Sequence, residues 1–293
     1  MRCYHPLKAF RTSSGVSFSE LARDDHVGDI ELPCGQCIGC RERRASEWTL
    51  RVMHEATCHD TSCFVTLTYS PEHLPPGGTL DHRHFQLFMK RLRKRFGPSR
   101  FYMCGEYGPL DSRPHYHAVL FGVDFRSTWR HAGKSRSGSI FYSSSTLTSL
   151  WGLGICSVQP LTRETAGYCA RYILKKQLGR NASYDLVDSD GVVTPRRPEY
   201  AAMSLKPGIG AEWFHKFSSD VLSGDSVVAD GAEKRVPRYY DKLSKRMGVE
   251  ADLVAMQRAE RGRRTVEDST PERLAVRERV HLARISNHLK RGS

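Results

Sequence analysis

Alternating apolar and polar positions predict several short strands in the first half of the chain. Residues 62–69, Ser-Cys-Phe-Val-Thr-Leu-Thr-Tyr, are rich in β-branched and aromatic side chains, which favour a strand. Residues 101–108 predict a second strand, and a loop rich in Gly, Pro, Asp and Ser joins it to a third at 113–122. Residues 155–160 predict a fourth, whereas the polar, Gly- and Ser-rich segment 124–143 predicts a loop.

Apolar residues at intervals of three and four predict helices between these strands. One helix covers 41–59, a second follows a cap at Asp81 or Thr79 and continues to Phe96, and a third opens at Thr162. Short strands interrupted by two or three helices favour the α+β class.

Two histidines share one face of the third predicted strand. Side chains alternate along a strand, so His115 and His117 point to one side and Tyr116 to the other. Glu106, on the preceding strand, can come level with the histidine pair. Two neutral imidazoles and a carboxylate make a three-ligand site with open positions, suited to Mg²⁺ or Mn²⁺. For the His-x-His pattern alone, a hydrogen-bonded polar pair on a half-buried sheet is the alternative.

Two tyrosines lie four residues apart on the third predicted helix. Tyr168 and Tyr172 therefore share one helix face, with a rise of about 6 Å between them, and Lys175 and Lys176 continue that face. A nearby cation favours tyrosinate, so these phenols can act as nucleophiles. The alternative is a pair of tyrosines packed on the sheet with their hydroxyls in water.

A cysteine cluster lies near the start of the chain. Cys34, Cys37 and Cys40 are spaced two residues apart twice, and Cys3 is available as a fourth thiolate. Four sulfurs would form a closed tetrahedral zinc site that orders a segment with little apolar area. The spacing also fits an iron–sulfur cluster, but the Cys-Pro that follows in that pattern is missing. Unliganded thiols are the third alternative.

Composition points to a polyanionic partner. The 293 residues carry a formal net charge of +13, and Lys and Arg neutralise phosphates, so nucleic acid is the default partner. The basic helix face at 90–95 is either solvated surface or a contact to a DNA backbone. Residues 234–293 hold sixteen Lys and Arg against eight Asp and Glu, which predicts a loosely attached basic arm that adds sequence-independent DNA affinity.

Targeting and membrane signals are missing from the sequence. No apolar run approaches the roughly 20 residues that a bilayer span needs, and the first residues lack an apolar signal core. Nine cysteines, an odd number with three clustered, favour metal ligation in a reducing compartment over a disulfide framework. We therefore expect a soluble protein inside the cell.

In their order along the chain, these motifs resemble those of the histidine-hydrophobic-histidine rolling-circle endonucleases. A strand ending near Tyr69, the strand with Glu106, the His-Tyr-His strand and a helix with Tyr-x3-Tyr-x2-Lys match that superfamily in sequence. The two-tyrosine form resembles the replication initiators of small circular single-stranded DNA phages. The chain is most similar to the gokushovirus branch of the microvirus replication-associated proteins, over roughly residues 1–245. The further shared segments are Pro33–Cys40, Lys206–Gly210 and Pro237–Tyr240.

The resemblance implies a five-stranded antiparallel sheet with helices on one side and the active site over its middle strands. It implies Mg²⁺ or Mn²⁺ at His115, His117 and Glu106, although Glu72 or Asp111 could supply the third ligand. Tyr168 and Tyr172 would be nucleophiles that form a 5′-phosphotyrosine and release a 3′-hydroxyl primer. Lys175, in preference to Lys176, would stabilise the phosphate or the tyrosinate.

We expect four segments along the chain. These are a Cys-rich zinc segment with a basic helix (1–60), the endonuclease core (61–178), a family-specific extension packed on the core (179–247) and the basic arm (248–293). The expected partners are single- and double-stranded origin DNA and the host replicative helicase and DNA polymerase, in the bacterial cytoplasm, with no membrane and no small-molecule substrate. The alternatives are a plasmid or transposon nickase of the same superfamily and a non-catalytic zinc-dependent DNA-binding protein.

Overall fold

The computed structural model divides into two compact units. One unit is Ala45–Val249, and the other joins Met1–Arg44 to Glu250–Ser293. The structure describes residues 3–19, 26–108, 112–135, 138–175, 185–187, 191–248, 252–263 and 266–291. Within these ranges, the description leaves out the side chains at 172–175, 252, 253, 255 and 287–291.

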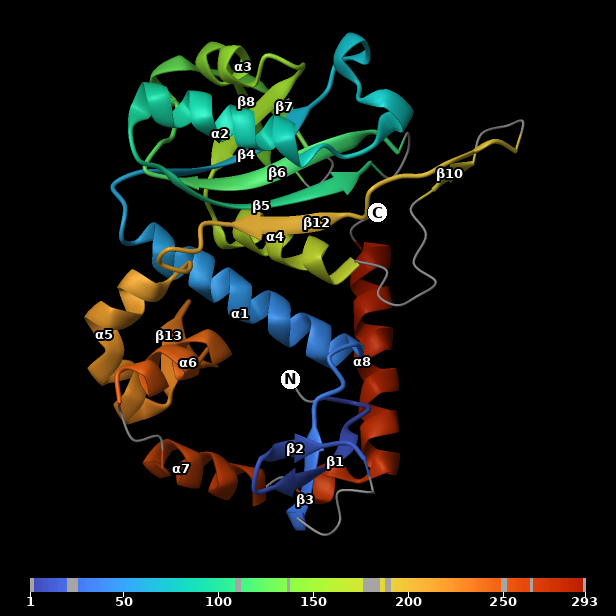
Figure 1. Cartoon of the computed structure of the whole chain (residues 1–293), viewed down its shortest axis with the longest axis vertical. Coiled ribbons are helices and arrows are strands. Elements are labelled where there is room, and N and C mark those ends of the chain that lie inside the picture. Colours follow the sequence, from blue (N-terminus) through green and yellow to red (C-terminus); the bar gives the residue numbers. More distant parts are fainter. Residues whose placement is uncertain are drawn as a thin grey trace. The chain divides into compact units, whose positions relative to one another are not determined.

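The larger unit is built on a seven-stranded antiparallel sheet with the strand order β12-β5-β6-β4-β9-β8-β7 (Figure 1). Its strands are β4 (Ser62–Thr68), β5 (Arg100–Tyr107), β6 (Pro114–Phe121), β7 (Trp129–Lys134), β8 (Ile140–Ser144), β9 (Cys156–Pro160) and β12 (Tyr200–Met203). The predicted α+β class is confirmed, and the sheet has seven strands where about five were expected.

The expectation of a loop over 124–143 is wrong, because this segment contains the hairpin of β7 and β8. Tyr142 in β8 pairs with Val158 in β9, which joins the hairpin to the sheet. The ring of Tyr142 stacks on Trp129, with 4.6 Å between the ring centroids, and both rings pack against the apolar core. Two aromatic anchors therefore order a segment whose other residues are mostly polar.

Helices cover both faces of the sheet, whereas the resemblance implied helices on one side (Figure 1). On the first face lie α2 (His82–Phe96) and α3 (Ser145–Trp151). The predicted cap of α2 is confirmed at Asp81, whose carboxylate accepts a hydrogen bond from the Arg83 amide (2.9 Å). Large side chains on this face are fully buried, among them Phe85, Phe88, Leu92, Tyr116 and Trp151.

The second face carries α1 (Ile38–Ala56) and α4 (Arg163–Lys175) (Figure 1). The predicted opening of α4 at Thr162 is confirmed, because its amide donates to the Thr165 hydroxyl (2.9 Å) and its hydroxyl accepts from the Thr165 amide (3.3 Å). A second apolar cluster lies between these helices and the sheet and includes Val52, Phe64, Tyr102, Val119, Phe121, Ala166 and Cys169. Sheet strands buried on both faces have little freedom to slip in register.

A third apolar cluster holds the remaining elements of the larger unit. Tyr240 is fully buried there, and its hydroxyl lies 2.8 Å from Nδ1 of His54. The elements are α5 (Ala211–Gly224), β13 (Ser226–Ala229), β14 (Ala232–Arg235) and α6 (Arg238–Arg246), and β10 (Leu186–Val187) and β11 (Val193–Thr194) form a separate ribbon.

The smaller unit brings residues from near both ends of the chain together. Its elements are β1 (Leu7–Thr12), β2 (Gly15–Ser17), β3 (His26–Leu32), the first turns of α1, α7 (Asp252–Arg263) and α8 (Pro271–Arg291). His5 contacts Glu278 of α8 (2.8 Å), and the Tyr4 hydroxyl contacts Nδ1 of His281 (2.8 Å). Across the described ranges, no helix combines the length and apolar character that crossing a membrane requires.

Replacing Glu55 by alanine is expected to lower the free energy of unfolding by about 3 to 5 kcal/mol. The Glu55 carboxylate is buried and accepts hydrogen bonds from the Arg100 guanidinium and the Gly210 amide (2.7 Å), so its loss leaves a largely buried cation and an N–H group without their acceptor. Urea unfolding followed by circular dichroism measures the change. Glu212→Ala, which removes an exposed acid in α5, should change stability by less than about 0.5 kcal/mol, and equal losses would contradict the assignment.

Candidate functional site

The register of the sheet brings a carboxylate and two imidazoles together. Glu106 of β5 lies opposite His115 of β6, and His117 lies opposite Thr66 of β4. Because side chains alternate along a strand, Glu106 and both histidines project from the same sheet face, which is the face that carries α4.

The three side chains converge on one oxygen atom. Nε2 of His115 and Nε2 of His117 each lie 2.8 Å from Oε1 of Glu106. The carboxylate is 1% exposed and His117 is 6% exposed, so the group is nearly closed to solvent on the protein side. One nitrogen or oxygen from each residue lies within 4.8 Å of the others, which is compact enough for a single metal ion to contact all three.

Hydrogen bonds at the other ring nitrogens orient both histidines. Nδ1 of His115 lies 3.0 Å from the backbone carbonyl of Arg113, and Nδ1 of His117 lies 2.9 Å from Oγ1 of Thr66. A carbonyl can only accept, so Nδ1 of His115 carries a proton, and the neutral ring then presents a lone pair at Nε2. A lone pair facing a carboxylate at 2.8 Å requires a proton or a cation between them.

The electrostatics of Glu106 fit a cation site. Burial by itself raises the pKa of this carboxyl, but hydrogen bonds from His115 and His117 outweigh burial and lower the pKa below its usual value. Burial also lowers the pKa of His117, which favours its neutral, metal-binding form. Oε2 of Glu106 is buried and has no hydrogen-bond partner among the residues that the structure describes. A buried anionic oxygen of this kind is suited to a cation.

One predicted nucleophile reaches this group. The hydroxyl of Tyr168, on α4, lies 3.5 Å from Oε1 of Glu106, and its ring meets the ring of His117 edge-on at 4.8 Å between centroids. Phe64 stacks on the other ring of this contact, His117, at 5.6 Å between centroids. The phenol oxygen therefore lies beside the candidate metal ligands.

The remaining predicted site residues are less completely defined. Tyr172 and Lys175 belong to the backbone of α4, but their side chains lie outside the described residues, as do Lys176 and Asp111 as a whole. Glu72 is exposed on the short 3-10 helix Pro71–His73 and is not among the residues whose ligand atoms converge.

Sequence reasoning missed two orienting groups, the Thr66 hydroxyl and the Arg113 carbonyl. The first had a usable signal, because Thr66 lies on the predicted strand 62–69 in the same alternation as Phe64, and antiparallel pairing can place it beside His117. The second had none, because a backbone carbonyl carries no residue-specific signal.

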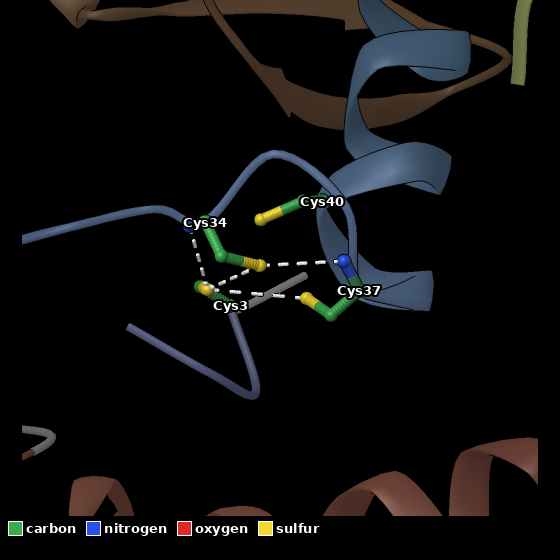
Figure 2. Close-up of side chains that lie close together, drawn as sticks. All are labelled: Cys3, Cys34, Cys37 and Cys40. Atoms are coloured by element: carbon green, nitrogen blue, oxygen red, sulfur yellow. Dashed lines mark hydrogen bonds between the residues drawn. The ribbon is translucent and has the colours of Figure 1, made fainter. Parts of the chain in front are cut away.

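The cysteine cluster lies in the smaller unit, at the start of α1. Figure 2 shows the sulfur atoms of Cys3, Cys34, Cys37 and Cys40 facing a common centre. Sγ of Cys3 lies 3.6 Å from Sγ of Cys34 and 3.9 Å from Sγ of Cys37. Zinc–sulfur bonds of about 2.3 Å at tetrahedral angles separate the sulfurs by about 3.8 Å, so these distances fit a four-thiolate zinc site.

Backbone amides favour thiolate in this cluster. The amides of Gln36 and Cys37 donate to Sγ of Cys34 at 3.5 and 3.3 Å, and the Tyr4 amide donates to Sγ of Cys37 at 3.3 Å. Burial acts to raise the pKa of Cys34, but these amides and the neighbouring thiols outweigh it and lower the pKa to about 7. All nine cysteines of the chain lie in the described ranges as free thiols, so none competes as a disulfide.

Comparison with known proteins places this geometry in a family. Residues 62–177 match the family described as replication-associated protein ORF2. The chain is 30% identical over 257 residues to replication-associated protein VP4 of Bdellovibrio phage phiMH2K, which covers 84% of this chain and 78% of the relative. The chain belongs to the microvirus replication-associated proteins. The resemblance predicted from the motifs is therefore confirmed.

Two further relatives of this replication-associated protein come from other viruses. Replication-associated protein ORF2 of Spiroplasma virus 4 is 30% identical over 271 residues, covering 84% of this chain and 81% of the relative. Replication-associated protein ORF4 of Chlamydia phage 1 is 29% identical over 224 residues, covering 74% of this chain and 54% of the relative. No solved structure matches the chain. Its place is therefore in the replication of viral genomes, and the matched range contains Glu106, both histidines and both tyrosines.

Proposed function

We propose that this replication-associated protein nicks one strand of DNA at a viral replication origin and later rejoins the displaced strand into a circle. One observation carries the proposal: the Tyr168 hydroxyl lies 3.5 Å from the carboxylate oxygen that two imidazoles also contact. A nucleophile beside a ligand set for a divalent cation suits phosphoryl transfer.

The residues divide the chemistry between them. His115, His117 and Glu106 would hold Mg²⁺ or Mn²⁺, which when bound polarises the scissile phosphate and neutralises the charge that develops on it. Tyr168 attacks phosphorus, and the bond from phosphorus to the 3′ oxygen breaks, which gives a 5′-phosphotyrosine and a free 3′-hydroxyl. The phenol loses its proton in this step, and Oε1 of Glu106 is an acceptor for it at 3.5 Å.

Rejoining needs a second nucleophile, for which we propose Tyr172. Tyr172 follows Tyr168 by one turn of α4, about 6 Å along the axis, so one helix can present both phenols to one phosphate site in turn. Tyr172 would cut the regenerated origin, and the new 3′-hydroxyl would attack the first phosphotyrosine and close the circle. Lys175, at the end of the same helix, would stabilise negative charge near phosphorus.

The expected partners follow from this chemistry. Single- and double-stranded origin DNA is the substrate, which a formal net charge of +13 favours. The 3′-hydroxyl would prime a host DNA polymerase, and a host helicase would separate the strands, in the cytoplasm of a bacterial host. The viral relatives support this scheme over that of a plasmid or transposon nickase.

We also propose that Cys3, Cys34, Cys37 and Cys40 hold a structural Zn²⁺. The sulfur separations of 3.6 and 3.9 Å and the amides that donate to sulfur support this assignment. Four protein ligands would leave no open position, so the ion would stabilise the fold of the smaller unit without taking part in chemistry.

Peptide mapping tests the nucleophile. Incubation with Mn²⁺ and a labelled origin strand should give an SDS-resistant adduct, and trypsin then separates the two tyrosines, because Arg163, Arg171 and Lys175 place Tyr168 in 164–171 and Tyr172 in 172–175. Tyr168→Phe should slow formation of the first adduct at least about 100-fold, because the ring contacts persist while the oxygen is lost.

Two controls keep this test decisive. Tyr142→Phe removes a phenol oxygen on the opposite face of the sheet and should leave adduct formation unchanged. An adduct in the double variant Tyr168→Phe/Tyr172→Phe would show that the nucleophile lies elsewhere.

The Thr66 hydroxyl is expected to tune metal affinity through His117. Thr66→Val keeps the side-chain shape but removes the group 2.9 Å from Nδ1, so Mn²⁺ affinity measured by calorimetry should fall by about 10- to 100-fold. Thr66→Ser keeps the hydroxyl and should bind Mn²⁺ as the wild type does. Equal affinities in all three proteins would remove Thr66 from the site.

Natively purified, reduced protein is expected to contain one zinc ion that remains after the Mg²⁺ or Mn²⁺ is dialysed away. Inductively coupled plasma mass spectrometry measures the stoichiometry, and Cys37→Ser should lower it because one of four ligands is weakened. Cys58→Ser, outside the cluster, is the matched control. Wild-type protein without zinc, or iron in its place, would contradict the assignment.

A further inference from the structure

We infer that one face of α8, together with Tyr4, binds the phosphate backbone of DNA. The inference rests on the proposed function for its ligand, DNA, and on the smaller unit for everything else. It assigns a binding role to a surface that lies outside the residues of the nicking site.

A hollow runs along this helix face. Its lining residues recur at intervals of three and four, so they form one continuous stripe over three turns of α8, and Tyr4 borders the stripe. Arginines alternate along it with valines, and no acidic side chain lines it. The lining residues are Tyr4, Arg273, Val276, Arg277, Val280, His281 and Arg284.

Tyr4 is held in place from two sides. Its amide donates to Sγ of Cys37 (3.3 Å), and its hydroxyl lies 2.8 Å from Nδ1 of His281. Nε2 of His281 in turn contacts the Glu42 carboxylate at 2.9 Å. The wall of the hollow is therefore fixed by the cysteine cluster and by α8, and it needs no rearrangement to meet a ligand.

The charge of the face is positive after its ion pairs are counted. Arg273 and Arg277 share one carboxylate, that of Asp268, at 3.1 and 3.3 Å. Arg284 is exposed and has no ion pair within the described ranges. Glu278, on the same helix, contacts His5 instead. Three guanidinium groups thus face one carboxylate.

The spacing of the cations suits a polyanion better than an isolated phosphate. Arg277 and Arg284 are seven residues apart, which is about 10 Å along the helix axis. Phosphates on one DNA strand advance by about 3.4 Å per nucleotide in duplex geometry, so the two guanidinium groups match phosphates about three nucleotides apart. Valines between the arginines can contact the sugars that separate those phosphates, and guanidinium groups bind phosphate oxygens in pairs.

Arg284→Gln against Arg279→Gln in the full chain tests the inference. Both arginines are exposed on α8, but only Arg284 lines the hollow. Fluorescence anisotropy with a 20-nucleotide strand that lacks an origin gives the affinity from about 0.05 to 0.3 M salt. Loss of one phosphate contact should lower the salt slope by about 0.7 to 0.9 and weaken binding about sixfold at 0.1 M salt for Arg284→Gln alone.

The outcomes separate this inference from the proposed function. Equal effects of the two substitutions, or no effect of either, would overturn the binding face. A duplex of the same sequence forms the second arm, and the larger loss between the two arms identifies the strand form that the face contacts. Adduct formation with saturating origin strand should be unchanged in Arg284→Gln. A wild-type protein that binds DNA but forms no adduct would refute the nicking chemistry while leaving the binding face intact.

Discussion

The pairing of β5 with β6 is the constraint on which the rest of the site depends. It sets Glu106 opposite His115 and gives one carboxylate oxygen two imidazole contacts of 2.8 Å. A slip of one residue would turn the histidines to the opposite face and replace them with Tyr116. Apolar side chains fix the register from both sides, since Ala118 and Leu120 pack under α2 and α3 while Val119 and Phe121 pack beneath α1 and α4. The site is therefore a consequence of a core buried on two faces.

Much of this site could be predicted because its signals are local. Strand alternation is enough to pair His115 with His117, and a short loop to the preceding strand brings Glu106 level. The position of Tyr168 over that group needed the packing of α4 on the sheet, which helix periodicity alone does not give. The hairpin in 124–143 was missed because two aromatic rings order it within a polar segment. The partners of α8 were hidden because they lie more than 200 residues away in sequence, at Tyr4 and His5.

The two groups of candidate ligands differ in the chemistry of their donors. Imidazole and carboxylate atoms gather beside a phenol, and one buried carboxylate oxygen has no partner within the described part of the chain. Four sulfurs gather without any neighbouring nucleophile, and amides donate to them from the backbone. Hard oxygen and nitrogen donors suit a cation that exchanges ligands during a reaction, whereas four thiolates suit one that only holds structure. The protein thus keeps its reactive and structural centres in separate units.

The smaller unit is discontinuous, since Met1–Arg44 precedes and Glu250–Ser293 follows the whole of the larger unit. During synthesis the ribosome exposes the cysteine segment first and delivers the residues of α8 last. At roughly 5 to 20 residues per second, the early segment waits about 10 to 40 s for its helical partner. In that interval the intervening sheet can complete its own folding, so assembly of the nascent chain would proceed from the middle outward.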